Sequence, residues 1–332
     1  MVSDRISAEL EFSLFPILPV SLETLMLAYV VRRIAVAIPT LLFVITISFF
    51  MMRLAPGGPF DREKQLPPEI EANILRAYNL DKPVYIQYFN YLASISKGDF
   101  GPSYKYLDFT VTDLILTGFP VSLRLGLYAI LLAIVVGVTA GTFAALRQNS
   151  FVDYMVMGVA MTGIAIPNFV MAPLLALIFG VYFSLLPVAG WGGGKLQYQI
   201  LPVITLALPQ IAYIARLTRG SMVEVLHSNF IRTARAKGIA EKTVVIRHAL
   251  KGGLLPVVSY LGPATAAVIT GSVVIESIFD VPGIGRYFVN GALNRDYPVV
   301  MGVVVFYAVL IIMLNLIVDC IYGFLDPRVK VE

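Results

Sequence analysis

Only 14% of the 332 residues are charged, against roughly 25% in an ordinary soluble domain. The apolar set makes up 58% of the chain, and the mean hydropathy is +0.81. A water-soluble fold could not cover so much apolar surface with so few charges, so the surplus must face lipid. The composition also excludes a disordered chain, and the single cysteine, Cys320, excludes a disulfide scaffold.

Six segments approach the roughly 20 apolar residues that a helix needs to cross a bilayer. They cover residues 34–52, 125–146, 154–186, 200–215, 254–275 and 299–318. The third is longer than one span requires, and Pro167 and Pro173 predict that it is kinked or divided. The fourth is the shortest, and Pro202 and Pro209 interrupt it. The pattern predicts an all-α integral membrane protein with six transmembrane helices.

Basic residues orient these spans. The connection 216–253 carries eight basic and two acidic residues, so the positive-inside rule places it in the cytoplasm together with both termini. The segment 276–298 and the connection 54–121 then lie outside. That outer connection is too long for a simple linker. A helical pattern at 69–78 and an aromatic run predict a small packed subdomain there. The aromatic run consists of Tyr85, Tyr88, Phe89 and Tyr91.

Residues 1–26 are interpreted as an N-terminal extension or the product of a misassigned start, with the start open between Met1 and Met26. Prolines interrupt the apolar stretch 10–22, which is too short to span. Acidic residues stand where a signal peptide needs basic ones. The other predicted divisions are a first transmembrane helix at 27–53, a permease core at 122–320, a last transmembrane helix at 299–319 and a cytoplasmic tail at 320–332.

The basic connection 216–253 predicts two short helices. Ser221 can cap the first, Gly238 interrupts the pattern, and Gly252 with Gly253 ends the second. Two simple interpretations remain open at this point. Such a basic amphipathic hairpin can lie on anionic lipid, or it can serve only as the orientation signal.

The hairpin residues resemble a known family. The run Arg232-Thr-Ala-Arg-Ala-Lys-Gly238 and the later Arg247-His-Ala-Leu-Lys251 are similar to the signature loop of binding-protein-dependent ABC importer permeases, in the variant typical of the peptide and nickel subfamily. Further similar stretches are 50–59, 98–103, 276–285, 294–298 and 326–327. The resemblance covers about residues 27 to 330.

The resemblance implies a type I importer permease, multi-pass in the bacterial inner (plasma) membrane, with a small extracytoplasmic subdomain between the first two spans. It implies the non-catalytic subunit of an ATP-driven oligopeptide importer, forming half of the translocation pathway and working by alternating access. The implied partners are a homologous permease, two cytoplasmic ABC ATPases that hold ATP and Mg, a periplasmic peptide-binding protein, the peptide substrate and membrane lipid. No cofactor on this chain and no nucleic acid are expected.

Alternatives remain for the substrate and the driving force. Dipeptides, nickel or another solute of the subfamily are not excluded by the spacing of motifs. An ion-coupled secondary transporter is less favoured, because it would need buried carboxylates within the spans, whereas Glu276 and Asp319 lie at span ends.

The candidate functional residues fall into three groups. The resemblance implies an ATPase-coupling loop at Arg232, Ala234, Arg235, Lys237, Gly238, His248 and Leu250. Polar residues inside spans are candidates for the pathway, with hydrogen bonding between helices as the alternative: Asn168, Thr205, Gln210, Thr270 and Asn315. Residues expected to face the receptor are Asp99, Tyr104, Glu276 and Asp280. Separately, Gly137 and Gly141 predict close helix packing.

Common catalytic motifs are absent from the sequence. The run Gly190-Trp-Gly-Gly-Gly-Lys195 is one residue short of a phosphate loop, and Leu196 replaces its Ser or Thr. The two histidines, His227 and His248, lie 21 positions apart with one distant cysteine, so no metal site is expected. ATP hydrolysis is therefore expected on partner subunits.

Overall fold

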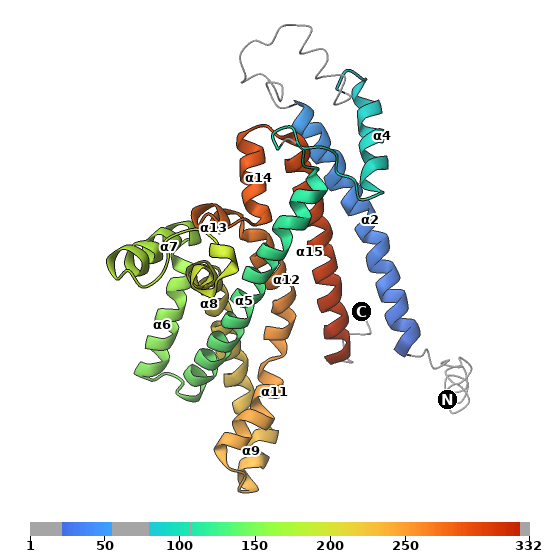
Figure 1. The fold of residues 1–332 in the computed structure, drawn as a ribbon. Coiled ribbons are helices and arrows are strands. Elements are labelled where there is room, and N and C mark those ends of the chain that lie inside the picture. The colour runs from blue at the N-terminus through green and yellow to red at the C-terminus, as the bar shows by residue number, and fades with distance from the viewer. Residues whose placement is uncertain (1–21, 55–79, 107, 326–332) are drawn as a thin grey trace, which may run out of the picture.

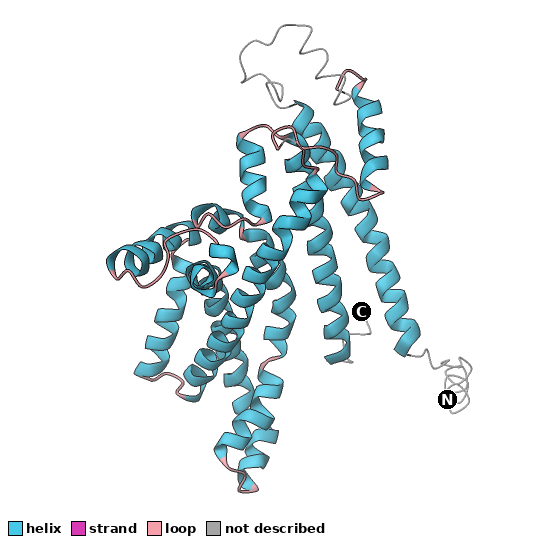
Figure 2. Ribbon diagram, viewed as in Figure 1, coloured by secondary structure: helices cyan, strands magenta, loops and turns pink. Residues whose placement is uncertain are grey.

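The computed structural model describes residues 22–54, 80–106 and 108–325. Figure 2 shows helices joined by loops throughout these ranges, and the only strand-like pairing among them is an isolated bridge between Pro102 and Thr110. The helix predicted at 69–78 and most of the predicted extension 1–26 lie outside the described residues. The described part is therefore all-α, as the hydropathy pattern predicts.

The main helices, labelled in Figure 1 where there is room, follow one another in this order. They are α2 (Leu22–Leu54), α4 (Val84–Ile95), α5 (Val111–Leu146), α6 (Phe151–Ala165), α7 (Asn168–Leu175), α8 (Leu196–Leu226), α9 (Asn229–Ala236), α10 (Glu241–Thr243), α11 (Leu250–Gly253), α12 (Leu255–Gly271), α13 (Val273–Ile278), α14 (Ile284–Leu293) and α15 (Tyr297–Leu325). Two π-helical turns, Ala176–Tyr182 and Val244–Ala249, follow α7 and α10.

Five helical segments of the described chain are long and apolar enough to cross a membrane, and the bent pair α6–α7 adds a sixth if it counts as one span. The two arms of that pair meet at 105°, which confirms the break predicted at Pro167. Pro167 has the extended backbone of an N-cap, so α6 ends before it and α7 starts after it. Figure 1 shows α7 turning away from the direction of α6.

The centre of the bundle is the contact between α5 and α8. A Cβ added at Gly137 would lie 2.8 Å from the side chain of Ile214, and one at Gly141 would collide with the carbonyl oxygen of Ala215. The predicted close packing at these two glycines is confirmed. α8 runs unbroken through its two prolines and packs against both α5 and α6. Half of the residues in its most apolar stretch are therefore buried, whereas only 6% are buried in the corresponding stretch of α2. The shortest predicted span is thus a central helix, and α2 is peripheral.

The second span begins earlier than predicted. α5 starts at Val111, so the expected boundary at residue 121 falls inside the helix. Its start is a capping box, in which the Thr110 hydroxyl accepts the Asp113 N–H while the Asp113 carboxylate accepts the Thr110 N–H. The Asp113 carboxylate, whose charge argues against a membrane span at this position, therefore caps the helix.

The segment between the first two spans packs onto the first helix. On α4, the rings of Tyr88 and Tyr91 lie 5.3 and 6.0 Å from that of Phe49 on α2, while Tyr85 and Phe89 are exposed. In Figure 1, α4 and α14 lie at one end of the bundle. The start of α2, the end of α15, α9 and α11 lie toward the other end. These two groups of elements therefore lie at opposite ends of the bundle.

Candidate functional site

The hairpin at the lower end in Figure 1 is an extension of α8. That helix continues to Leu226, so Ser221 lies inside it and does not cap a new helix, contrary to the prediction. Ser228 has the extended N-cap backbone that starts α9. The helix does not break at residue 221 because Met222, one position later, is fully buried in the hairpin cluster. This cluster consists of Ala145, Met222, Ile231, Ala234, Val244, Val245 and Ala249. The hairpin is therefore packed firmly against the ends of α5 and α8.

The tip of the hairpin turns at Gly238, where φ is +72°. Its N–H donates to the carbonyl of Arg235 at 2.9 Å, and the N–H of Ile239 donates to that of Ala234 at 3.4 Å, which closes the end of α9. A Cβ on Gly238 would meet nothing within 4 Å. Within this chain, glycine is needed there for its left-handed backbone and not for space.

The exposed face of the hairpin combines cations with apolar side chains. Arg235 makes two hydrogen bonds to Glu241, at 2.6 and 3.1 Å, which brace the tip. These bonds hold the pKa of the Glu241 carboxyl below its ordinary value. Phe230 and Ile246 are each 53% exposed. Arg232, Lys237 and Arg247 are exposed as well. Such a surface suits a groove with an apolar floor and an acidic rim.

Three of the predicted coupling residues are not on this exposed face. Ala234 is buried in the hairpin cluster and Leu250 packs against it. His248 is half-buried. Ala234 and Leu250 therefore build the hairpin. The prediction treats them as contact positions because a loop signature records residue types and not the direction of side chains.

A buried ion pair, which was not predicted, ties α8 to α6. The Arg219 Nε and Nη2 atoms each lie 2.6 Å from an oxygen of Asp153, whose side chain is 1% exposed. The N–H of Asn149 donates to the same carboxylate at 2.9 Å. A signal existed, since Asp153 is the only acidic residue between Asp113 and Glu224 in an otherwise apolar stretch.

The predicted pathway residues have different hydrogen-bond surroundings in the described structure. Thr205 is fully buried and its hydroxyl donates to the Leu201 carbonyl at 2.8 Å. That bond satisfies the hydroxyl as a donor within its own helix. Thr270 bonds back to its own helix in the same way. Asn168, at the bend, and Asn315, on α15, each have a buried side-chain oxygen with no hydrogen-bond partner among the described residues.

Gln210 belongs to a polar strip on α8 and α12. Its Oε1 accepts the hydroxyl of Tyr260 at 2.7 Å, the rings of Tyr260 and Tyr213 lie 5.7 Å apart, and the Arg216 guanidinium lies 5.7 Å from the Tyr213 ring. Gln210, Tyr213 and Tyr260 are half-buried and Arg216 is exposed. The prediction missed the two tyrosines because an aromatic residue in an apolar span carries no signal of its own.

Glu276 does not face a receptor, contrary to the prediction. It is fully buried, and its carboxylate accepts the Ser272 hydroxyl at 2.5 Å and the Gly285 N–H at 2.8 Å. A Cβ on Gly283 would collide with it, so the turn between α13 and α14 wraps closely over the carboxyl group. The hydropathy pattern around Glu276 does not show that the following turn folds over its side chain.

The other residues predicted to face the receptor lie in two places: Asp99 and Tyr104 follow α4, and Asp280 lies in the turn between α13 and α14. Asp99 and Asp280 are exposed. Asp280 pairs with Arg286 at 3.1 Å, and Tyr104 lines a cavity between α4 and α15. In the described part of the chain, no three His, Cys, Asp or Glu side chains gather as a metal site.

Two family models match the chain. Residues 137–331 match the family described as binding-protein-dependent transport system inner membrane component. Residues 26–126 match the N-terminal family of such membrane components.

Curated relatives extend along nearly the whole chain. The oligopeptide transport system permease protein OppB of Salmonella typhimurium is 57% identical over 92% of this chain and 100% of its own length, and that of Escherichia coli is 56% identical over the same shares. The dipeptide transport system permease protein DppB of Bacillus subtilis is 45% identical over 92% of this chain and 99% of its own length.

Among solved structures, an inward-facing MetNI methionine ABC transporter chain is similar in fold. The TM-score is 0.56 at 16% identity, over 64% of this chain and 96% of that one. At that identity the similarity concerns the fold alone.

Proposed function

Because the chain belongs to the family of binding-protein-dependent transport system inner membrane components, we propose that it is the permease subunit of an ATP-driven oligopeptide importer. The single observation that carries this proposal is the 57% identity to an oligopeptide permease over that relative's whole length. The dipeptide relative from Bacillus subtilis, at 45%, makes dipeptides the second candidate cargo. The motifs in the outer and hairpin segments resemble those of the B subunit of oligopeptide permeases.

The chain works without catalysing a reaction itself, and the hydrolysis of ATP with Mg takes place on two partner ATPases. The hairpin is the surface that contacts them. Its exposed cations and the apolar side chains of Phe230 and Ile246 support this role. A homologous permease completes the pathway, and a peptide-binding protein delivers cargo at the opposite end.

Force from the ATPases passes through α8. The hairpin cluster holds α9 to the end of α8, and the Arg219–Asp153 pair holds α8 to α6. At 1.5 Å per residue, the 31 residues of α8 span about 46 Å. A displacement of the hairpin therefore moves α8 as a rigid lever.

Peptide contacts the polar strip on α8 and α12. Polar groups that are half-exposed inside apolar spans normally face a water-filled cavity or another helix. The Gln210 amide and the Tyr213 and Tyr260 hydroxyls can hydrogen-bond the main chain of any peptide without reading its side chains. Arg216 supplies a cation for a peptide carboxylate.

Buried carboxylates favour an ion-coupled transporter, and both Asp153 and Glu276 are buried. Asp153 is paired with Arg219, however, and the Glu276 carboxylate accepts the Ser272 hydroxyl and the Gly285 N–H. A carboxylate with this set of donors serves to fix the turn before α14. ATP-driven transport therefore fits the chain better than coupling to protons.

The proposal is tested by reconstituting the chain with the homologous permease, the two ATPases and the peptide-binding protein in liposomes. Uptake of a labelled pentapeptide should require ATP on the hairpin side and should survive a proton uncoupler. A labelled dipeptide serves as the competing cargo. Uptake that follows a proton gradient without ATP, or an importer that prefers the dipeptide, would contradict the proposal.

Coupling is tested at Gly238. A Gly238→Leu variant should retain assembly but lose most of the ATPase stimulation and uptake, because the left-handed turn strains any residue with a Cβ by about 1–2 kcal/mol and a bulky side chain blocks docking. Gly220→Leu is the matched control, since that glycine lies on exposed helix with nothing within 4 Å of an added Cβ. Normal coupling in the Gly238 variant, at wild-type membrane levels, would remove the hairpin from the mechanism.

A further inference from the structure

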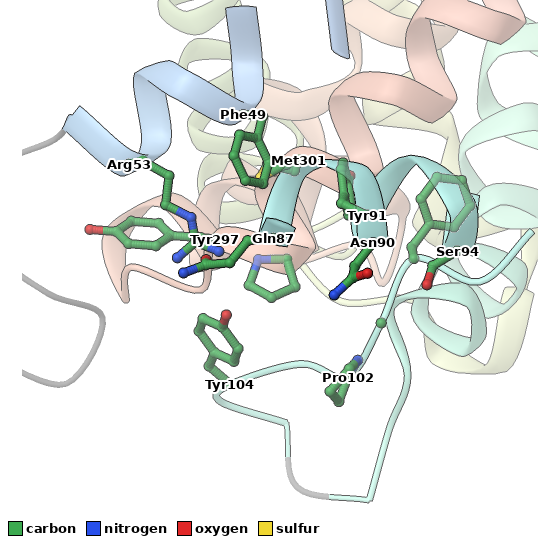
Figure 3. Close-up of a pocket in the computed structure, with 13 residues that line it drawn as sticks. Phe49, Arg53, Gln87, Asn90, Tyr91, Ser94, Pro102, Tyr104, Tyr297 and Met301 are labelled. Carbon is green, nitrogen blue, oxygen red and sulfur yellow. The ribbon is translucent and has the colours of Figure 1, made fainter. Parts of the chain in front are cut away.

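A cavity of about 200 Å³ lies at the outer end of the bundle. Its walls come from the end of α2, one face of α4, the loop at 100–104 and the first turn of α15 (Figure 3). The apolar part of the lining includes Phe49, Pro102 and Met301. At roughly 30 Å³ per water molecule, the volume is too small for a drug-sized ligand and fits one amino-acid residue.

Two buried polar atoms in the lining lack hydrogen-bond partners among the described residues. They are the Oε1 of Gln87 and the hydroxyl of Tyr91. The Gln87 Nε2 donates to the carbonyls of Lys82 at 2.7 Å and Leu80 at 3.2 Å, which fixes the orientation of the amide. Burial raises the pKa of the Tyr91 hydroxyl above its ordinary value. Unpartnered groups of this kind cost stability unless a ligand completes them.

The lining also carries a cation that has no acidic neighbour among the described residues. The Arg53 guanidinium lies 5.3 Å from the Phe49 ring, and no carboxylate of the described residues lies within ion-pair distance of it. None of the lining residues is acidic. The site therefore offers a cation for an anion, a fixed oxygen acceptor for an N–H group, and a hydroxyl.

The cavity is held in shape before anything binds. Asp296, which is fully buried just before α15, accepts the Ser103 hydroxyl at 2.5 Å and the Tyr104 N–H at 3.1 Å. These bonds tie the 100–104 loop to the start of α15. A preformed pocket loses less entropy when it is occupied.

We infer that this cavity receives an acidic side chain from a protruding segment of the external peptide-binding protein, with the carboxylate on Arg53 and the adjoining main-chain N–H on Gln87. A residue within a polypeptide supplies both the anion and the N–H donor, and its stem fits the apolar walls. The inference rests on the proposed function, since it names a contact of the importer's receptor.

The position of the cavity favours the receptor over the cargo. The cavity is built on α2, α4 and α15, whereas the polar strip proposed for peptide lies on α8 and α12. Tyr104 lines the cavity, and Asp99 directly precedes Phe100 of the lining. The cavity lies at the end away from the hairpin (Figure 1).

The test measures the affinity of the importer in lipid nanodiscs for its peptide-loaded binding protein, identified as the one that stimulates the wild-type ATPase. Arg53→Gln should weaken this affinity about tenfold, because one charge-assisted hydrogen bond is lost, and should flatten its dependence on salt. Lys97→Gln is the matched control: it removes an exposed cation of the same outer segment that does not line the cavity, and it should leave the affinity unchanged. Co-elution with the partner subunits checks assembly of each variant.

A second variant separates binding from structure. Tyr91→Phe removes the unpartnered hydroxyl, so the thermal stability of the importer should stay the same or rise while its affinity for the binding protein falls severalfold. A variant that is more stable but binds normally would mean that the hydroxyl meets only water, which overturns the inference.

The remaining outcomes are distinct. Unchanged affinity in Arg53→Gln overturns the inference. Normal affinity with reduced pentapeptide uptake also overturns it, because the cavity would then contact cargo. A wild-type importer that neither binds the binding protein nor imports peptide would instead refute the proposed function, whatever Arg53 does.

Discussion

Asp153 and Glu276 are two of the buried carboxylates that hold separate parts of this bundle, and they are satisfied in different ways. Asp153 meets a cation, with both of its oxygens 2.6 Å from nitrogens of Arg219. Glu276 meets the Ser272 hydroxyl and the Gly285 N–H. The first arrangement joins two helices through a charge pair. The second anchors a turn by neutral donors, so the two sites should respond differently to substitution.

Replacing Arg219 by Ala should destabilise the permease by about 3 kcal/mol, because Asp153 would remain buried without a cation. The measurement is the apparent melting temperature of the purified protein in detergent. The Asp153→Asn, Arg219→Gln double variant should recover part of the loss, since no unpaired charge remains. Equal melting temperatures for the single and double variants would contradict a role for charge.

The Arg235–Glu241 pair should show a weak pH dependence. Because Arg235 lowers the pKa of Glu241 below its ordinary 4.5, the pair stabilises the tip above that pH and loses its effect as the pH falls through the lowered value. Both side chains are exposed, so the contribution should be below about 1 kcal/mol and should shrink with salt. Hydrogen-exchange protection of residues 239–243, corrected for intrinsic rates, measures it. Glu241→Gln should remove the dependence on pH.

At the scale of elements, the close approach of α5 and α8 depends on residues without side chains. Without a hydrophobic drive between helices in lipid, packing at small residues supplies much of the association. Gly137 and Gly141 leave room for the backbone and side chains of α8 between Ile211 and Thr218. This interface is what makes α8 a continuous lever in spite of its prolines.

A single methyl group at this interface should be costly. Gly141→Ala should lower the melting temperature, because the new Cβ would collide with the rigid Ala215 carbonyl. Gly158→Ala is the matched control on α6, where nothing lies within 4 Å of an added Cβ; it should be neutral or gain about 0.5–1 kcal/mol from helix propensity. A Gly141 variant as stable as the control would show that the two helices can separate freely.

At the scale of the whole molecule, the hairpin and the outer cavity lie at opposite ends of the bundle (Figure 1). The positive-inside rule assigns the hairpin end to the cytoplasm. In a Cys320→Ser background, cysteines introduced at the exposed Lys97 and Lys237 should report this orientation. A membrane-impermeant maleimide should label position 97 in intact spheroplasts and position 237 only after permeabilisation. Labelling of position 237 in intact spheroplasts would reverse the assignment.

The sequence by itself determined the features that depend on local chemistry. Apolar runs of sufficient length predicted the spans, since hydropathy is a property of composition. Pro167 predicted the break in the third segment because proline restricts its own and the preceding backbone. Gly238 predicted the turn of the hairpin, and the Gly137 and Gly141 pair predicted a close helix contact. Motifs of the hairpin indicated the family that the relatives then supported.

Only the tertiary structure decided which polar groups meet. Asp153 and Arg219 are 66 positions apart, Ser103 and Asp296 are 193 apart, and Gln210 and Tyr260 are 50 apart, so no local pattern could join them. Glu276 reads as an exposed residue at a span end until the following turn folds over it. The outer cavity exists only where segments from three parts of the chain converge. The physical reason is the same in each case: hydrogen bonds and cavities depend on positions in space, which long-range packing sets.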